Sequence, residues 1–229
     1  MKMVQLLTYA FVTLMVISSF SGNSGTYKNE KIALVFGETI YLKDLEPEER
    51  ELDRYKRSYP DLSTAEIVNR VHNSKLTSLI WKQVVSKFSE NYDVEPSQEE
   101  VDDYINAMEA LSSERPKSEA NWRPTEIESE EINEQISNIY KDFVRTYKIS
   151  KKLYELYGGV VIFQQGNPLE PVGAYRKLLE FHESNKDFVI YNKESKTSFW
   201  DYYVREHRSI IPEDKVDYTV PWWKRALEK

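Results

Sequence analysis

Three histidines are the side chains that could most readily act as a general base or bind a metal ion. They are His72, His182 and His207. None of them stands in a His-Glu-x-x-His or His-x-His arrangement, and His182 shares a polar helix end with Glu183. We interpret all three as surface or helix-end residues. We therefore predict no catalytic residue, no metal ligand, no cofactor-binding residue and no cofactor.

Carboxylates are numerous, and paired carboxylates could serve glycoside hydrolysis. Most of them stand near expected helix starts, where acidic side chains interact favourably with the helix dipole. Capping and solvation therefore explain them without catalysis. The residues concerned are Glu46, Glu48, Glu49, Glu51, Glu99, Glu100, Asp102, Asp103, Glu128, Glu130 and Glu131. The chain also has no cysteine, phosphate-binding loop, nucleophile elbow or dinucleotide fingerprint, so we expect no enzymatic activity.

Aromatic side chains could line a groove for extended polypeptide, because they offer a large, sequence-tolerant contact area. The candidates are Tyr140, Tyr147, Tyr154, Tyr157, Trp81, Trp200, Trp222 and Trp223. The four tyrosines have helical spacing, which fits packing in a core better than a groove. The tryptophan pair differs, because it stands in a proline-flanked tail beside Lys224 and Arg225. This pair either docks on the body of the protein or contacts a partner.

The composition indicates a globular protein with a strongly solvated surface. Of the 229 residues, 40% are hydrophobic and 30% are charged, with a formal net charge of -7. An acidic surface disfavours non-specific binding to nucleic acid and to anionic lipid headgroups. We therefore expect no nucleic-acid partner.

The N-terminus has the pattern of a signal peptide over residues 1–21. Lys2 precedes an apolar run from Leu6 to Ile17, and small residues follow at Ser19 and Ser21. The run is shorter than the roughly 20 residues that span a bilayer, so we expect no stable membrane span in the mature chain. An uncleaved N-terminal anchor is the alternative. The chain has no Asn-x-Ser/Thr sequon, so nothing in it suggests eukaryotic secretion, and we expect export to the periplasm.

The hydrophobic pattern predicts a mainly helical chain that begins with a β-hairpin. The hairpin strands are expected at Ile32–Phe36 and Thr39–Tyr41, on either side of Gly37. Two capping boxes begin at Ser63 and Ser97. Helices are expected over Asp44–Tyr59, Ser63 to about Asn91, Ser97 to about Leu111, Glu130–Tyr157, Pro168–Glu183 and Thr197–His207.

The second half of the chain contains two further β-type runs, at Val160–Gln165 and Phe188–Tyr191. Residues 112–130 are rich in Ser, Glu and Pro and are expected to be a flexible connection. A Gly pair at 158 and 159 is expected to end the long preceding helix. The predicted fold is therefore mainly α, with a short β-hairpin and a small C-terminal α/β module.

The segment from Ile32 to Met108 resembles the N-terminal domain of the SurA and PrsA group. That family has a strand of the form V-A-V-V-N-G-E and then an I-T strand, matched here by Ile32–Glu38 and Thr39-Ile40. A long helix with a Leu-Ile pattern follows, matched by Leu76–Val85, and then an element matched by Val94–Asp102. Two residues depart from the pattern. Phe36 replaces the usual Asn before the turn Gly, and Trp81 stands where a polar residue is common.

This resemblance implies a helical chaperone domain that binds unfolded or extended polypeptide segments without ATP. Outer-membrane proteins are among its candidate clients. In SurA a C-terminal helix packs back on this domain, and the helix at Glu130–Tyr157 is expected to take that role. We therefore predict one SurA-like domain over residues 30–157 and a module of unknown role over residues 158–229.

Two other functions stay open. The chain could be an assembly partner of one specific envelope protein, because the resemblance does not cover residues 158–229. It could also be a degenerate prolyl isomerase, since the family often carries parvulin domains. The parvulin signature is poor here, because Gly159 is followed by Val160 rather than an acidic residue and His207–Ile211 only weakly resembles the closing strand.

Overall fold

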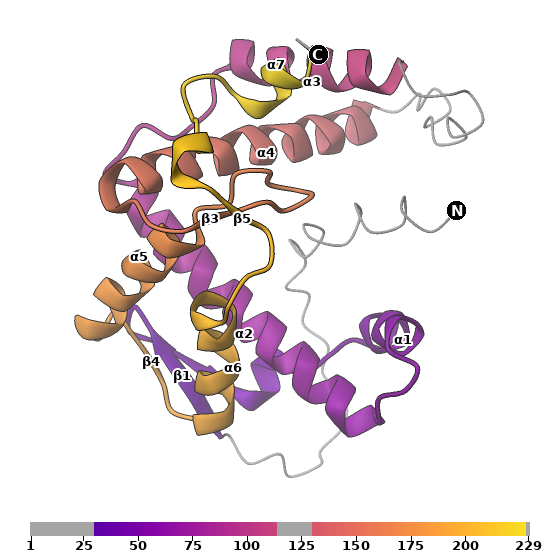
Figure 1. The fold of residues 1–229 in the computed structure, drawn as a ribbon. Helices are drawn as coiled ribbons and strands as arrows, with labels where there is room; N and C mark the ends of the chain where they lie inside the picture. Colours follow the sequence, from indigo (N-terminus) through magenta and orange to yellow (C-terminus); the bar gives the residue numbers. More distant parts are fainter. Residues whose placement is uncertain (1–29, 114–129, 228–229) are drawn as a thin grey trace. The chain divides into compact units, whose positions relative to one another are not determined.

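The computed structural model describes residues 30–113 and 130–227, and Figure 1 shows its helices and strands. The expected signal peptide at residues 1–21 lies outside the described residues. So does most of the expected connection at residues 112–130.

The described elements group into two units by their contacts. The first unit contains the residues up to Glu90 together with Arg176–Glu206. The second unit contains Asn91–Tyr175 together with His207–Lys229. Each unit is therefore built from two segments that are distant in the sequence.

The first unit opens with the expected antiparallel hairpin of β1 (Lys31–Val35) and β2 (Glu38–Tyr41). Both turn residues have positive φ, 46° at Phe36 and 86° at Gly37. A left-handed conformation costs a residue with a Cβ roughly 1–2 kcal/mol, which explains why Asn is usual in the family at the first position. Here the turn is tied down, because the Phe36 N–H donates to the Asp187 carbonyl and its ring meets the His182 ring 5.5 Å away.

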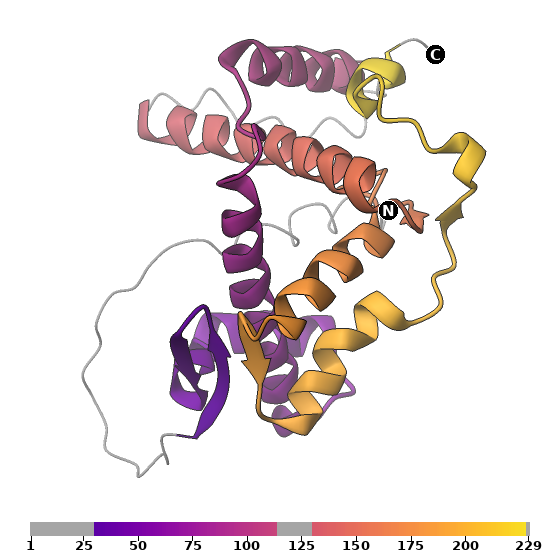
Figure 2. The ribbon, with the colours of Figure 1, turned by 90° about the vertical axis from the view of Figure 1, so that its left-hand side faces the viewer.

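A third strand, β4 (Phe188–Ile190), pairs antiparallel with β1 and completes a sheet of order β2-β1-β4. Figure 2 shows the orange β4 beside the indigo hairpin. Val35 lies opposite Phe188 and Ala33 lies opposite Ile190 in this register. Ala33, Val35 and Phe188 have no exposed surface, so this pairing lies at the centre of the unit's core.

Helix α2 (Thr64–Ser89) is the longest element of the first unit. Its N-terminus has the predicted capping box, in which the Ser63 N–H donates to Glu66 Oε2 at 2.8 Å and the Glu66 N–H donates to Ser63 Oγ at 3.3 Å. The helix buries one apolar stripe, which consists of Ile67, Val71, Leu76, Ile80, Val84 and Phe88. Helix α6 (Lys193–Val204) packs on α2 and on β4, with the Phe199 ring 5.6 Å from Phe188.

The segment before α2 forms a 3-10 turn, η1 (Leu42–Leu45), and then helix α1 (Glu49–Ser58). The sequence predicts a single helix over Asp44–Tyr59. The structure divides this segment around Pro47, which has no backbone N–H to donate within a helix. Helix α1 packs on α2 although none of its own residues is buried. Lys75 of α2 holds it, because its Nζ lies 3.1 Å from Glu51 Oε2 and also donates to the Glu46 carbonyl.

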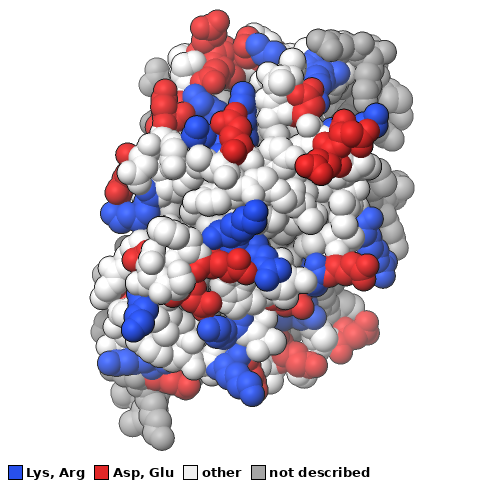
Figure 3. All heavy atoms as spheres, turned by 60° about the vertical axis from the view of Figure 1, so that its left-hand side comes forward, with Lys and Arg blue, Asp and Glu red and all other residues white. Residues whose placement is uncertain are grey.

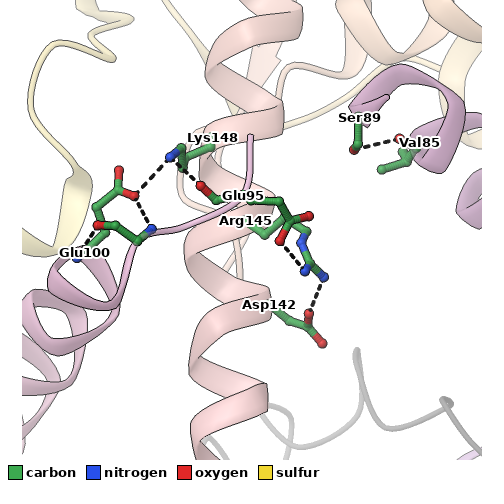
Figure 4. A network of polar contacts seen from close by, with 8 residues as sticks. Val85, Ser89, Glu95, Glu100, Asp142, Arg145 and Lys148 are labelled. Carbon is green, nitrogen blue, oxygen red and sulfur yellow. Dashed lines mark hydrogen bonds and ion pairs between the residues drawn. The ribbon is translucent and has the colours of Figure 1, made fainter. Parts of the chain in front are cut away.

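The second unit is built on α3 (Gln98–Ser113) and α4 (Glu130–Tyr157), which pack against each other. An ionic network joins α4 to the first turn of α3 and to the chain just before it (Figure 4). Arg145 pairs with Glu95 at 2.6 Å, and Lys148 Nζ donates to Glu100 Oε2 at 2.9 Å and to the Glu95 carbonyl at 2.7 Å. Glu100 also completes the predicted capping box with Ser97.

The remaining elements of the second unit are short. They are β3 (Val161–Ile162), the first turn of α5 (Val172–Ser184), β5 (Ile210–Ile211), η2 (Glu213–Lys215) and α7 (Trp222–Ala226). Strands β3 and β5 pair antiparallel. The remainder of α5 belongs to the first unit.

The structure confirms the mainly helical fold with a few short antiparallel strands. The two units do not follow the boundary that the sequence analysis places at residue 158. Strand β1 pairs not only with β2 but also with β4, which lies about 150 residues later in the chain. The long helix α4 packs on α3, whereas β4 and α6 pack with the hairpin and α2.

Cutting the chain after Tyr157 tests this interleaving. We expect the shortened chain to lose cooperative thermal unfolding, because β1 loses its partner β4 and α2 loses the cover of α6. Circular dichroism at 222 nm during heating measures the effect. A chain ending at Leu227 is the control and should melt like the full chain. Cooperative melting of the 1–157 chain at an unchanged temperature would contradict the expectation.

Gly173 lies against the backbone of Gly159 and Val160. A Cβ at position 173 would lie 2.4 Å from the Val160 nitrogen, a distance that real Cβ atoms do not tolerate. We expect Gly173→Ala to lower the free energy of unfolding by about 2 kcal/mol or more, since overpacking costs typically 1–3 kcal/mol. Gly166→Ala is the matched control, because a Cβ there meets nothing within 4 Å. Equal urea midpoints for the two variants would contradict this close packing.

Candidate functional site

The tyrosines and tryptophans proposed from the sequence to line a groove are divided between the two units. Several lie in one apolar cluster of the second unit, around the fully or nearly buried Tyr104, Tyr147, Tyr218 and Trp223. Half-buried Tyr140, Tyr154 and Trp222 pack against that cluster. The helical spacing favoured packing in a core over a groove. This prediction is confirmed for Tyr147, which lies in the cluster, and for Tyr140 and Tyr154, which pack against it.

Two hydroxyl groups of this aromatic cluster bond to the backbone. Tyr147 donates to the Tyr218 carbonyl at 2.9 Å, and Tyr218 donates to the Leu169 carbonyl at 2.6 Å. Burial raises the pKa of Tyr147 to about 12 and raises the pKa values of Tyr104 and Tyr218 further. The three phenol groups are therefore neutral at physiological pH.

The tryptophan pair docks on the body of its own unit. Trp223 is 2% exposed, and its ring lies 5.0 Å from that of Tyr147 and 5.1 Å from that of Tyr104. Trp222 is half-buried and meets Tyr104 edge-on at 6.0 Å. Of the two roles left open by the sequence, docking is the one observed. Trp81, Trp200 and Tyr157 are half-buried.

The histidines lie beside separate carboxylates. His182 Nδ1 is 2.7 Å from Asp187 Oδ2, and His72 Nε2 is 3.8 Å from Glu46 Oε2. Burial lowers the pKa of His72, although the Glu46 carboxylate opposes this shift. His207 belongs to the second unit. Over residues 30–113 and 130–227, no group of three His, Asp or Glu side chains could hold a metal ion.

An open groove of about 580 Å³ lies in the first unit, between α1, α2 and α6. Its floor is one face of α2, formed by Arg70, Asn73, Ser74, Thr77 and Ser78. These positions are spaced i, i+3, i+4, i+7 and i+8, which places them on the same side of a helix. The apolar stripe of α2 occupies another side and faces the core, so this polar side is left for solvent or a ligand.

The walls of the groove come from the two neighbouring helices. Tyr55 and Tyr59 stand at the C-terminal end of α1 and just beyond it, with their rings 6.1 Å apart, and Ser198 contributes from α6. A short loop joins α1 to α2, so the two tyrosines return beside the first turns of α2. The Arg70 guanidinium carbon lies 4.9 Å from the centre of the Tyr59 ring. Ser198 also lines a second open depression, of about 540 Å³, along α6.

The lining of the groove is polar and aromatic. Its lining combines amide and hydroxyl groups with two phenol rings, and Arg70 is its one charged residue. Such groups can donate and accept hydrogen bonds and offer flat contact surfaces at once. None of these residues is predicted from the sequence as part of a site, because the apolar stripe is the stronger pattern in α2. The polar residues of the floor recur every three or four positions, and this spacing was the one sequence pattern that could have indicated a polar helix face.

Charges elsewhere on the surface are mixed. On the face drawn in Figure 3, Lys and Arg side chains are interspersed with Asp and Glu side chains. None of the described helices is both long and apolar enough to cross a membrane.

A family model described as the SurA-like N-terminal domain matches residues 1–125. This match covers more than half of the 229 residues, and the chain belongs to that family. The family is of the chaperone type, as the sequence resemblance implies. The matched part includes the hairpin, α1, α2 and α3, and thus the floor of the groove and its tyrosine wall, whereas Ser198 and β4 lie beyond it. Comparisons with curated proteins and with solved structures gave no match.

Docking of the tryptophan pair can be tested by truncating each ring. We expect Trp223→Ala to lower the free energy of unfolding by about 3–5 kcal/mol, the usual cost of removing a buried large aromatic ring. Trp222→Ala, at the half-buried neighbour, should cost less than half as much. Denaturant unfolding monitored by circular dichroism measures both. Equal effects of the two substitutions would contradict the observed difference in burial.

Proposed function

We propose that this protein is a periplasmic, ATP-independent, chaperone-like protein that binds unfolded or extended polypeptide segments. We further propose that the segment lies in the groove between α1, α2 and α6. Binding alone is proposed, without a catalytic step or a cofactor. The groove's polar, hydrogen-bonding floor and tyrosine wall are the observation that carries the proposal.

The lining suits an extended segment for a physical reason. An unfolded segment has backbone N–H and C=O groups without internal partners, and these need hydrogen bonds wherever water is displaced. Asn73, Ser74, Thr77 and Ser78 can supply donors and acceptors whatever the client's side chains are. The faces of Tyr55 and Tyr59 accept apolar or aromatic side chains at little entropic cost, because tyrosine has few rotatable bonds.

The packing of α1 also supports binding of varied segments. This helix has no buried residue and is held to α2 by the Glu51–Lys75 ion pair and by ring contacts. Elements with few buried apolar contacts belong to the least stable parts of a fold. The tyrosine wall can therefore shift to fit segments of different width.

Aggregation of a chemically unfolded outer-membrane protein, followed by light scattering, tests the proposed function. The wild-type chain should suppress the scattering at several-fold molar excess. No suppression by the wild type would overturn the chaperone proposal.

A blocking variant locates the site. Ser74→Trp should fill the groove without touching the core, because Ser74 is an exposed residue of its floor. We expect it to lose at least half of the suppression. Ser86→Trp, at an exposed position farther along the same helix, is the matched control and should behave like the wild type. Full activity of Ser74→Trp would place the binding surface elsewhere.

The alternative, an assembly partner of one envelope protein, predicts a different result from affinity capture after in-cell crosslinking. A broad set of clients supports the chaperone function, whereas one stoichiometric partner supports the alternative.

A further inference from the structure

Arg70 differs from every other residue that lines the groove. It is the one charged residue of a lining that otherwise consists of hydroxyl, amide and phenol groups. Its side chain is exposed, and its guanidinium carbon lies 4.9 Å from the centre of the Tyr59 ring. Among the ion pairs formed by residues 30–113 and 130–227, none includes Arg70.

The carboxylate that could most easily neutralise Arg70 is already engaged. Glu66 stands one turn earlier on α2, but it accepts hydrogen bonds from the Ser63 N–H at 2.8 Å and from Ser63 Oγ at 2.6 Å. These capping bonds are the main cause of its lowered pKa, and Arg70 contributes only the smallest part of the shift. Glu51, on α1, is paired with Lys75. The cation of the groove is therefore available to an external anion.

The position of the Arg70 guanidinium over the Tyr59 ring suits it to bind a planar anion. A guanidinium held against an aromatic face keeps its N–H groups at the edge of its plane, where two of them can bind both oxygens of a carboxylate. Asn73 and Ser74 follow at i+3 and i+4 on the same face of α2, so an amide and a hydroxyl lie beside the guanidinium. Together they form a site for a carboxylate within a surface suited to polypeptide.

We propose that the groove selects extended segments that contain Asp or Glu, and that Arg70 binds the side-chain carboxylate. This inference rests on the proposed function and names its preferred substrate class. Side-chain carboxylates fit better than a terminal carboxylate, because the groove is open and its lining continues to Ser198. A segment can therefore pass through it instead of ending there.

The expected preference is modest. An exposed ion pair is weak, and bidentate geometry makes it stronger than a single contact. We expect a Glu-containing segment to bind about twofold to fivefold more tightly than its Gln counterpart at physiological salt. The formal net charge of -7 repels acidic segments at long range, but screening reduces that effect beyond roughly 8 Å.

Fluorescence anisotropy with two labelled, unstructured peptides tests the proposal. The peptides differ only in one central residue, Glu or Gln, and both have amidated C-termini. With the wild-type chain, the Glu peptide should bind more tightly. Arg70→Gln should remove the difference in affinity between the two peptides. Arg70→Lys should retain only part of the preference, because an ammonium cannot form the bidentate pair.

Arg54→Gln is the matched control. Arg54 also lies over a tyrosine ring, 5.7 Å from the centre of Tyr55, but it does not line the groove. This variant should keep the full preference for Glu. A preference lost equally in Arg54→Gln would indicate a general charge effect and overturn the assignment to Arg70.

The remaining outcomes separate this inference from the proposed function. Equal binding of the Glu and Gln peptides by the wild type overturns carboxylate selection while the proposed function stands. Absence of binding by both peptides overturns the proposed function and this inference together. A Gln peptide with a free C-terminus that binds as tightly as the amidated Glu peptide would assign Arg70 to terminal carboxylates and overturn the side-chain proposal.

Discussion

The pairing of β1 with β4 is the interaction on which the first unit depends. A hairpin of two short strands is marginal in water, and a third strand with a buried face makes it stable. Strand β4 supplies that third strand, and Val35 and Phe188 lie opposite each other with no exposed surface. The pairing also brings in α6, whose Phe199 packs on Phe188. Both the sheet and the α6 wall of the groove therefore follow from one contact between distant segments.

A second constraint is the division of α2 into two faces. The stripe from Ile67 to Phe88 is committed to the core, and it fixes which residues face outward. Because a helix has a fixed period, the polar residues from Arg70 to Ser78 then gather on one side. Helix α1 adds tyrosines to that side without burying any residue of its own. The groove is thus a consequence of core packing, with recognition chemistry placed on the face that the core does not use.

Local features of the sequence were sufficient to predict the long helices α2, α3 and α4 and the family. The capping boxes at Ser63 and Ser97 placed the starts of α2 and α3, and the Gly pair placed the end of α4. The interleaved units could not be predicted, because strand pairing between distant segments leaves no periodic signal in either one. The groove was missed for another reason: exposed Ser, Asn and Thr residues on a helix resemble ordinary solvated surface until α1 is seen beside them. The aromatic residues that were candidates for lining a groove belong largely to a core.

The position of β4 along the chain has a consequence for how the protein is made. During synthesis or export from the N-terminus, β1, β2 and α2 emerge long before Ile190. Their sheet cannot be completed until that strand follows, so the first unit stays open during most of the chain's passage. Contacts between distant segments also slow folding, because a long loop must close before they form. The first unit is therefore complete only when residues late in the chain have been made, although it contains the first strands of the fold.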